Sequence, residues 1–326
     1  MKFKKIVLNN FFDGEIIKEF SGNSGKVYLV KNNVTSPAYI AYKTCKYLCE
    51  ESKDLFDEEV LKWNSINSRY IVPIYYIHNI IGEYYACMRA CDGTLADLMS
   101  QKEVCETSAY IYALQIIKGL MDMNASSIEH HQDFNPQNIL FEDMSRLFRG
   151  FPPKEIHPSH RYRMMISDFA MSNYYVKNNI DGRAGGKFPF KAPEQYKDSQ
   201  LSDFEPDRFA LGVLLCMLFT GKHPCGFKQN QVFKKNPKKL KTSWKTWAHS
   251  GSKTVNFHNN EVSNLISSLL STEPEERPNY NECFGVIRKQ FEIFNPNEYS
   301  TAMFHIDYFD KQYSAYPRDK LRTRVN

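Results

Sequence analysis

The spacing of apolar and polar residues changes near residue 90 of the chain. Before that point, short runs rich in Val, Ile and Tyr, such as 26–30 (KVYLV) and 70–77 (YIVPIYYI), are separated by polar turns. Such runs are typical of β-strands. Residues 55–66 (LFDEEVLKWNSI) instead repeat apolar side chains at helical spacing. We therefore predict a small β-sheet with one helix over residues 14–90.

From about residue 95 the apolar spacing is mainly that of helices. Four stretches carry this pattern: 94–101, 107–124, 208–221 and 261–271. Residues 209–219 (FALGVLLCMLF) are apolar throughout, but this run of eleven is shorter than the roughly 20 residues that a membrane-spanning helix needs. We predict that this helix is buried and that the chain has no transmembrane segment. Residues 91–291 should form a larger, mainly helical lobe.

Three segments fall outside these two patterns. Residues 1–13 are a short N-terminal extension, and 141–165 are rich in Pro, Arg and His and are predicted to form an inserted loop. Residues 292–326 alternate polar and aromatic side chains without strong periodicity, so we expect a tail laid on the surface. The link between the two regimes is the polar stretch 89–94 (RACDGT). The expected architecture is an α+β fold with two lobes.

The composition fits a packed protein, because 42% of the 326 residues are hydrophobic and 14% are aromatic. The eight cysteines include no CxxC pair and no zinc-binding spacing, and the start of the chain shows no signal peptide. We therefore expect reduced thiols and a cytoplasmic location.

The positive charge of the chain is unevenly distributed. The net charge is only +5, yet Lys228–Lys245 contains seven lysines and no acidic residue. This stretch is either a solvated loop or a surface for a polyanion, such as nucleic acid, an anionic membrane or an acidic protein.

The predicted sheet carries two polar side chains that packing does not explain. Lys43 closes an apolar strand (YIAYK), and Glu59 lies on the predicted helix that follows, where it could pair with that lysine. Upstream, 20–30 (FSGNSGKVYLV) reads as strand, turn and strand. A turn of Gly and Ser lets backbone amides approach phosphate oxygens, although many hairpins use the same residues.

A second polar group follows the long helical stretch that ends at residue 124. In HQDFNPQN, Asp133 and Asn138 stand five residues apart beside Pro136, which suits a base that orients a hydroxyl group and a ligand for Mg²⁺. Asp168 ends the apolar stretch MMISD and offers another oxygen ligand. Either aspartate alone could simply cap a turn, but the ordered set indicates a catalytic centre.

The order of these motifs resembles that of eukaryotic-type protein kinases over residues 14–291. That family has a Gly-rich loop, a strand Lys, a helix Glu, an H-R-D-x-x-x-x-N loop, D-F-G and A-P-E, in this order. The counterparts here are GNSGKV, Lys43, Glu59, HQDFNPQN, SDFA and KAPE, followed by Asp207 and by Arg277, which is expected to pair with Glu194. Small-molecule kinases of related fold share H-x-D-x-x-x-x-N, but they typically lack A-P-E and this pairing.

The resemblance implies ATP and Mg²⁺ as cofactors and a protein as the substrate. Lys43, braced by Glu59, would hold the α- and β-phosphates, and Asp133 would accept or orient the substrate hydroxyl. Asn138 and Asp168 would hold Mg²⁺. The remaining nucleotide contacts would come from Gly22, Gly25, Val27, Ala41, Met88, Arg89 and Cys91.

Several residues depart from the family pattern. Phe20 replaces the first glycine of the loop, and Ala170 replaces the glycine of D-F-G. Gln132 stands where most members have an Arg that receives the phosphate of a modified activation segment, and a neutral amide cannot make that charge-assisted pair. We therefore expect activity that does not depend on phosphorylation of Ser172, Tyr174 or Tyr175 in that segment.

Two further departures affect the transferred phosphate. Asn135 stands where Ser/Thr-specific members have a Lys that assists the γ-phosphate, and Lys187 stands where they usually have a Thr. We predict that Lys187 supplies the missing charge; the alternative is that Lys187 points to solvent and that Asn135 only hydrogen-bonds to Asp133. The favoured function is a serine/threonine protein kinase. The alternative is a pseudokinase that binds nucleotide or acts as a scaffold.

Overall fold

The computed structural model describes residues 8, 11–21, 25–33, 38–45, 50–80, 82–126, 128–170, 186–196, 203–227, 232, 241–251, 253–315 and 322–325. Gly22, Ser172, Tyr174, Tyr175 and most of Lys228–Lys245 lie outside these residues. The chain divides into two compact units. Unit 1 comprises Met1–Asn67, Val72–Cys91 and Tyr316–Asn326, and unit 2 comprises Ser68–Ile71 and Asp92–Ala315.

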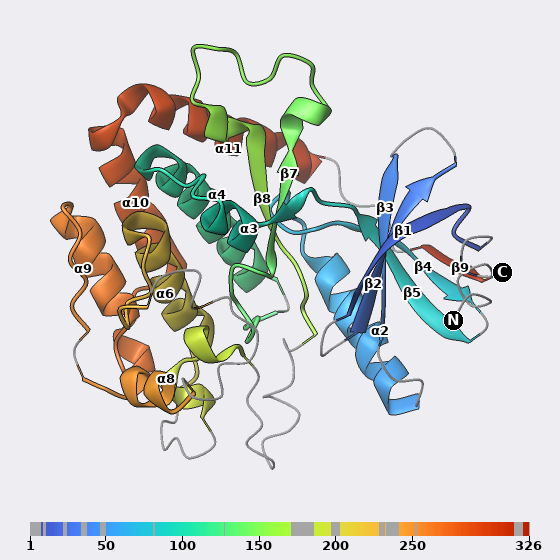
Figure 1. Cartoon of the computed structure of the whole chain (residues 1–326), viewed down its shortest axis with the longest axis horizontal. Helices are drawn as coiled ribbons and strands as arrows, with labels where there is room; N and C mark the ends of the chain where they lie inside the picture. Colours follow the sequence, from blue (N-terminus) through green and yellow to red (C-terminus); the bar gives the residue numbers. More distant parts are fainter. Residues whose placement is uncertain are drawn as a thin grey trace. The chain divides into compact units, whose positions relative to one another are not determined.

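Unit 1 is a six-stranded sheet with one long helix (Figure 1). Its strands are β1 (Gly14–Ser21), β2 (Gly25–Asn32), β3 (Tyr39–Cys45), β4 (Ile74–Ile80), β5 (Glu83–Arg89) and β9 (Arg322–Val325), and its helix is α2 (Glu50–Ser65). The order across the sheet is β1-β2-β3-β5-β4-β9. All neighbours are antiparallel except β4 and β9, which pair in parallel. Strand β4 begins after Pro73, which has no N–H to donate to a sheet ladder.

The strand register of unit 1 sorts its residues onto two faces. Alternate residues of a strand point to opposite faces, and residues directly opposite each other on paired strands share a face. One face carries buried apolar side chains that pack with Leu8 and Phe12 of the segment before β1. They are Ile16, Tyr28, Val30, Ile40, Tyr42, Ile80, Tyr85 and Cys87. The other face carries Lys43, which lies opposite Val27 on β2 and Ala86 on β5.

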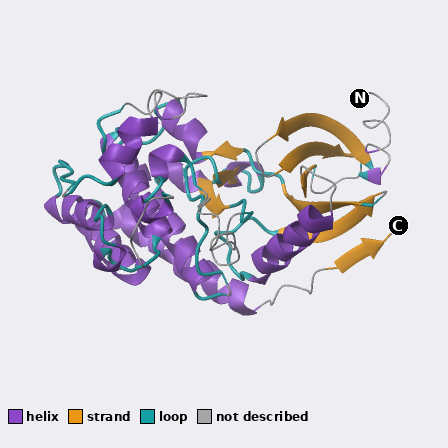
Figure 2. Cartoon of the chain, turned by 90° about the horizontal axis from the view of Figure 1, so that it is seen from below, coloured by secondary structure: helices purple, strands orange, loops and turns teal. Residues whose placement is uncertain are grey.

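Unit 2 is mainly helical and contains a small three-stranded sheet (Figures 1 and 2). Its strands are β6 (Gly93–Thr94), β7 (Ile139–Asp143) and β8 (Tyr162–Ile166), and its α-helices are α3 (Leu95–Ser100), α4 (Glu106–Asn124), α6 (Pro206–Thr220), α8 (Lys241–Ala248), α9 (Asn260–Leu269), α10 (Tyr280–Phe294) and α11 (Pro296–Ala315). Short 3-10 helices are η1 (Met144–Arg146), η2 (Pro158–Arg161), η3 (Phe188–Phe190), η4 (Pro193–Gln195) and η6 (Pro274–Glu276).

Helix α6 is the buried helix that the sequence predicts. Pro206 occupies its first turn, where its missing N–H costs nothing, and Gly221 ends it in a left-handed conformation with φ 69°. Gly212 allows close packing against α9, because a Cβ at this position would lie 2.8 Å from the Cβ of Leu269. No helix in the described part of the chain is long and apolar enough to cross a membrane.

The segments at 141–165 and 292–326 are more regular than the sequence predicts. The first begins in β7 and ends in β8, so the connecting loop is only 144–161. The second is no irregular tail: α10 continues to Phe294 and α11 forms a helix of 20 residues. Glu298 fixes α11 to the loop, because its carboxylate lies 2.8 Å from Nε2 of His160 and accepts the N–H of His157. These tertiary contacts stabilise a helix with a weak apolar pattern.

Candidate active site

Lys43 and Glu59 form a buried ion pair within unit 1. The ammonium group of Lys43 donates to Oε1 of Glu59, and the two side chains are only 5% and 8% exposed. Trp63 lies one helical turn after Glu59 and places its ring 5.5 Å from the Lys43 ammonium. The indole N–H of Trp63 donates to the Val72 carbonyl at 2.7 Å, which fixes the ring. The lysine is therefore held between a carboxylate and an aromatic face.

The predicted nucleotide contacts of unit 1 share the sheet face of Lys43. Ala41 lies two residues before Lys43 on β3, directly opposite Met88 on β5, and Val27 lies opposite Lys43 on β2. Arg89 ends β5, and the Cys91 thiol donates to the Arg89 carbonyl at 3.9 Å. The register therefore brings Val27, Ala41, Lys43 and Met88 onto one surface.

The strand residues beside the Gly-rich turn are also placed within unit 1. Gly25 begins β2 opposite Cys45, and Phe20 lies in β1 opposite Val27. The Phe20 ring is 46% exposed and has the Lys18 ammonium 4.6 Å from its centre.

In unit 2, the loop that carries Asp133 is fixed by hydrogen bonds to the side chain of Asp207. The fully buried carboxylate of Asp207, at the start of α6, accepts the backbone N–H groups of His131 at 2.5 Å and Gln132 at 2.9 Å. Nδ1 of His131 accepts the Asp133 N–H, so Nε2 carries the proton and donates to the Ser167 carbonyl at 2.9 Å. His131 thereby connects the loop to the residue before Asp168.

Two amide side chains hold Asp133. Asn138 donates through Nδ2 to the Asp133 carbonyl at 2.9 Å and to its carboxylate at 3.2 Å. Asn135 donates to the same two groups at 2.8 and 3.2 Å. Because the nitrogen of the Asn138 amide faces Asp133, its oxygen Oδ1 is left for another partner. The hydrogen bonds of Asn135 to Asp133 are those that the alternative interpretation of Asn135 describes.

The environment of Asp133 raises the pKa of its carboxyl group. Burial, and next the negative charge of Asp168, raise the pKa of Asp133 to about 6, whereas the Asn138 amide and the Lys187 charge act in the opposite direction. Asp168 has a left-handed backbone with φ 66°, and Phe169 after it is fully buried against the His131 ring. A carboxyl group with a pKa near neutrality suits proton transfer.

Lys187 lies beside Asp133 and does not point away from it. Its ammonium donates to Oε1 of Gln137 in the same loop, and its backbone N–H and its charge both act to lower the pKa of Asp133. Burial lowers the pKa of Lys187, and the Asp133 charge opposes this effect. The lysine therefore has its charge within reach of the catalytic loop, held by a glutamine that the motif comparison did not single out.

Gln195 is a second glutamine that the sequence reading missed. Its side chain is buried; Nε2 donates to the Gln132 carbonyl at 2.8 Å, and Oε1 accepts the Ala192 N–H at 3.0 Å. Gln132 itself has a left-handed backbone with φ 64°. Gly186 packs against this bridge, because a Cβ there would lie 3.0 Å from the Gln132 carbonyl oxygen. One neutral side chain thus connects the catalytic loop to η4.

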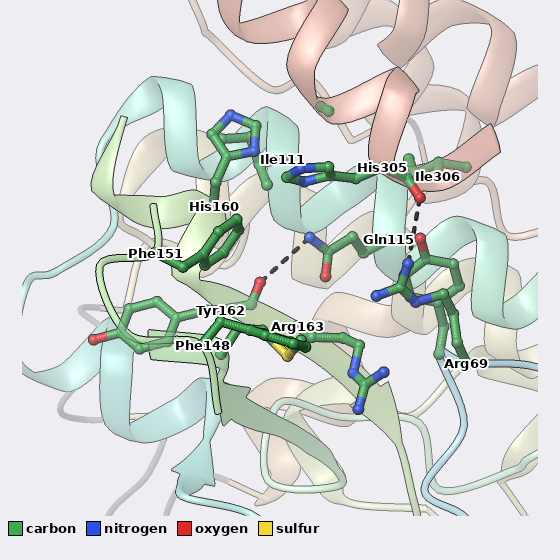
Figure 3. A pocket seen from close by; sticks show the side chains of 13 residues that line it. Arg69, Ile111, Gln115, Phe148, Phe151, His160, Tyr162, Arg163, His305 and Ile306 are labelled. Atoms are coloured by element: carbon green, nitrogen blue, oxygen red, sulfur yellow. Dashed lines mark hydrogen bonds between the residues drawn. The ribbon is translucent and has the colours of Figure 1, made fainter. Parts of the chain in front are cut away.

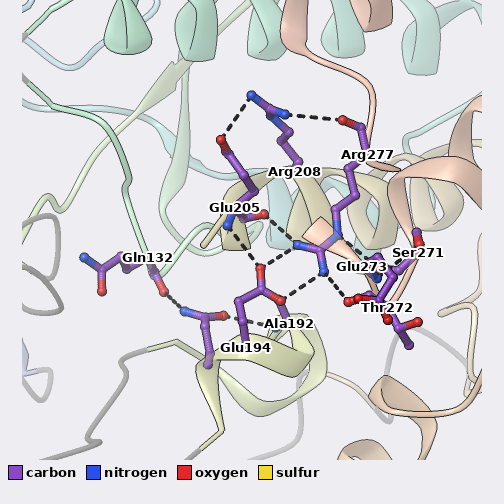
Figure 4. A network of polar contacts seen from close by, with 10 residues as sticks. Gln132, Ala192, Glu194, Glu205, Arg208, Ser271, Thr272, Glu273 and Arg277 are labelled. Atoms are coloured by element: carbon purple, nitrogen blue, oxygen red, sulfur yellow. Dashed lines mark hydrogen bonds and ion pairs between the residues drawn. The ribbon is translucent and has the colours of Figure 1, made fainter. Parts of the chain in front are cut away.

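Glu194 and Arg277 form the predicted pair (Figure 4). The guanidinium reaches both carboxylate oxygens, at 2.5 and 2.9 Å, and both side chains are almost fully buried. Arg277 also donates to the carbonyl groups of Glu205, Ser271 and Thr272. Such bidentate geometry with further hydrogen bonds offsets the cost of burying two charges.

Unit 2 also contains a pocket of about 220 Å³ that none of the predicted site residues lines (Figure 3). Helices α4 and α11, strand β8 and the loop 144–161 form its walls. Phe148 and Phe151 contribute apolar surface, and Arg69 donates to the His305 carbonyl at 3.3 Å. The loop 144–161 and helix α11 therefore form part of the wall of this pocket.

The structure thus brings the predicted residues together in two sets. Lys43 and Glu59 are paired in unit 1, on the sheet face of Val27, Ala41 and Met88. Asp133, Asn135, Asn138, Asp168 and Lys187 are connected by hydrogen bonds and charge interactions in unit 2. Gly22 lies outside the described residues.

Comparison with known families agrees with this arrangement. The model of the family described as protein kinase domain matches residues 20–286, which is most of the chain. The chain belongs to the protein kinase family. The α+β fold with a β-sheet unit and a helical unit is the fold that this membership implies.

The protein kinase domain is similar to several serine/threonine kinases. These include serine/threonine-protein kinase ULK1 from Homo sapiens, 26% identical over 235 residues (72% of this chain and 21% of that protein). A calcium and calcium/calmodulin-dependent serine/threonine-protein kinase from Pisum sativum is 25% identical over 224 residues (66% and 37%). A calcium/calmodulin-dependent serine/threonine-protein kinase from Malus domestica is 26% identical over 266 residues (77% and 57%). The match spans less than two thirds of the length of each relative.

Proposed function

We propose that the chain is an active protein kinase that transfers the γ-phosphoryl group of ATP to serine or threonine hydroxyls of proteins. The observation that carries this proposal is the network around Asp133, in which two amides hold a carboxyl group of raised pKa next to Asp168 and Lys187. Packing alone gives no reason to gather these polar groups. The names of the relatives support Ser and Thr as acceptors.

In the proposed reaction, each residue has a role that its contacts support. Asp133 orients the acceptor hydroxyl and takes its proton as the new P–O bond forms and the bond from the γ-phosphorus to ADP breaks. Lys43, fixed by Glu59, places a positive charge at the phosphates. Lys187 supplies the second positive charge on the catalytic-loop side. Positioning and charge neutralisation are most of what phosphoryl transfer requires.

The residues present fit a magnesium ion. Asp168 offers a carboxylate and Asn138 offers Oδ1, and hard oxygen ligands of this kind are those that Mg²⁺ prefers. When bound, Mg²⁺ would neutralise charge on the phosphates.

We further propose that activity does not require phosphorylation of the activation segment. Gln132 has no charge with which to bind a phosphate. Gln195 instead connects the Gln132 carbonyl to Ala192, so a bond internal to the unmodified chain holds η4 against the catalytic loop. This contact supplies the fixation that a phosphate would otherwise provide.

The decisive experiment is phosphate incorporation from labelled ATP into the protein itself and into a generic Ser/Thr substrate. Asp133→Ala and Asp168→Ala are the controls, and removal of Mg²⁺ with EDTA is a third. We expect incorporation by the wild-type protein alone and only with Mg²⁺. Signal equal to that of the two variants would reject catalysis and favour the pseudokinase alternative.

Activation is tested on the same protein after complete phosphatase treatment. We expect the dephosphorylated enzyme to retain its kcat. Loss of activity, with recovery once phosphate is restored to Ser172, Tyr174 or Tyr175, would reject independence from phosphorylation while leaving the kinase activity established.

A further inference from the structure

The edge strand β1 contains an irregularity that changes which of its side chains face each side of the sheet. Ile16 lies opposite Val30 of β2, but the register then shifts and Lys18 lies opposite Leu29. Ile17 is the extra residue of this β-bulge. A shift of one residue moves every later side chain of the strand to the other face. The residues of β1 after the bulge therefore alternate in the opposite sense from those before it.

The bulge turns Lys18 and Phe20 onto the sheet face that carries Lys43. Phe20 lies directly opposite Val27, and Val27 lies directly opposite Lys43. Residues that are directly opposite each other share a face, and Lys18 shares the face of Phe20 because it lies two residues earlier. Without the bulge, Phe20 would share the core face of Ile16, which lies four residues earlier.

The charge of Lys18 has no carboxylate partner in the described part of the chain. The ammonium group lies 4.6 Å from the centre of the Phe20 ring, and no acidic side chain that the structure describes pairs with it. The adjacent Glu19 lies on the opposite face, where it forms an ion pair with Lys26 at 2.7 Å. Lys18 is exposed, so its ammonium group is accessible to a ligand.

The position of this cation suits a polyphosphate bound on the same face. Lys43 and Glu59 form an ion pair, and the two side chains together carry no net charge. The backbones of Phe20 and Lys43 are two strand spacings apart, which is roughly 10 Å. The Phe20 ring holds the Lys18 ammonium beside its own row of the sheet, which is also the row of Lys43. Phosphates held by Lys43 would thus lie within the roughly 10 Å over which charges interact at 0.1 M salt.

We propose that Lys18 is a further cation for the phosphates of the bound nucleotide and that the Phe20 ring positions it. An ammonium group over an aromatic ring keeps N–H donors available for oxygen acceptors. A cation without a carboxylate partner attracts a polyanion such as ATP more strongly than a paired one does. This inference rests on the nucleotide binding of the proposed function and adds two residues to that site.

The test is direct binding of ATP and of adenosine, measured by isothermal titration calorimetry on Asp133→Ala protein so that no turnover occurs. We expect Lys18→Met to raise the Kd of ATP about fivefold and to leave the Kd of adenosine unchanged, because only ATP carries phosphates. Lys18→Arg keeps the charge and should stay within about twofold of the parent protein. Added NaCl should weaken ATP binding more in the parent protein than in Lys18→Met.

Lys26→Met is the matched control, because Lys26 lies on the neighbouring strand β2 but faces the opposite side of the sheet. Its Kd for ATP should equal that of the parent protein. A double-mutant cycle measures the role of the ring. Phe20→Leu should raise the Kd of ATP about threefold when Lys18 is present and should have no effect in Lys18→Met protein. An equal effect in both backgrounds would overturn the positioning by Phe20.

The outcomes separate this inference from the proposed catalysis. An unchanged Kd of ATP in Lys18→Met, or an equal loss for ATP and adenosine, would overturn the inference and leave the kinase activity intact. A protein that shows the expected effect of Lys18→Met but transfers no phosphate would support the inference and reject catalysis. A protein that binds no ATP would reject both.

Discussion

At Asp133, two opposing effects decide whether the carboxyl group is charged. Burial and the neighbouring Asp168 raise its pKa to about 6, while Asn138 and Lys187 lower it. Because the proposed base must be ionised to take a proton, the charged fraction falls as pH decreases through this value. We expect kcat/KM to fall about tenfold per pH unit below pH 6, as for loss of one catalytic base.

Lys187→Met tests the role of the lysine at this carboxyl group. Removing the positive charge removes an effect that lowers the Asp133 pKa, so the acid limb of the pH profile should move to higher pH. If Lys187 also contacts the phosphoryl group, kcat should fall about tenfold or more at pH 8, as for loss of a charge-assisted hydrogen bond. Both are read from kcat and kcat/KM measured between pH 5 and 9.

Lys289→Met, which removes an exposed lysine on α10, provides the reference profile. An unchanged kcat and an unmoved acid limb in Lys187→Met would reject the assignment of Lys187. A shifted acid limb with an unchanged kcat would mean that Lys187 acts only by lowering the pKa of Asp133.

Residue type determined which site residues the sequence could identify. Charged residues at the ends of apolar strands, such as Lys43 and Asp168, are conspicuous because packing does not explain them. Gln137 and Gln195 are neutral and form their bonds only after distant segments meet. A glutamine in a loop has no periodicity or charge pattern that distinguishes it, so the structure alone identifies these two.

Among the elements, strands of the sheet unit were more predictable than the last helices. Alternating β-branched and aromatic residues predict β2, β3 and β5. Helix α11 has apolar residues on its exposed side, such as Phe304 and Tyr308, as well as the buried Ile306, so its amphipathic pattern is weak. Its position depends on contacts such as that of Glu298 with His160. Contacts between residues far apart in the chain leave no local signal, which is why the expected tail proved to be a helix.

Gln195→Met tests the connection between the catalytic loop and η4. Methionine has similar bulk but cannot bond to the Gln132 carbonyl or the Ala192 N–H, and each buried group left without a partner costs about 1–3 kcal/mol. We expect the free energy of unfolding to fall by about 2–4 kcal/mol in urea titrations. We also expect a lower kcat, measured at a temperature well below the melting temperature of the variant, because the catalytic loop loses its hydrogen bond to Gln195.

Gln101→Met is a matched control, because the Gln101 side chain is exposed and the residue ends α3 through hydrogen bonds of its backbone N–H. Its unfolding midpoint and kcat should equal those of the wild type. A Gln195→Met protein with normal stability and normal kcat would show that the bridge does not fix the loop.

At the scale of the whole molecule, the chain divides into two compact units, and unit 1 contains a buried apolar cluster. The change from β to helical spacing predicts the division near residue 90, and Cys91 is the last residue of unit 1 before Asp92. The sequence gives no indication that Ser68–Ile71 belongs to unit 2 or that β9 pairs with β4. Both facts arise from long-range contacts, such as the bridge between Ile71 and Ile166.

The two compact units lead to a prediction for unfolding, because a chain with two such units need not unfold in one step. Ile66 in unit 1 and Leu114 in unit 2 are both fully buried, and Ile→Ala or Leu→Ala in a core costs about 2–5 kcal/mol. In scanning calorimetry we expect two overlapping transitions. Ile66→Ala should lower the midpoint temperature of the transition of unit 1, and Leu114→Ala that of unit 2. A single transition that both variants lower equally would instead mean that the two cores melt as one cooperative body, so that a change in either unit would act on the stability of both.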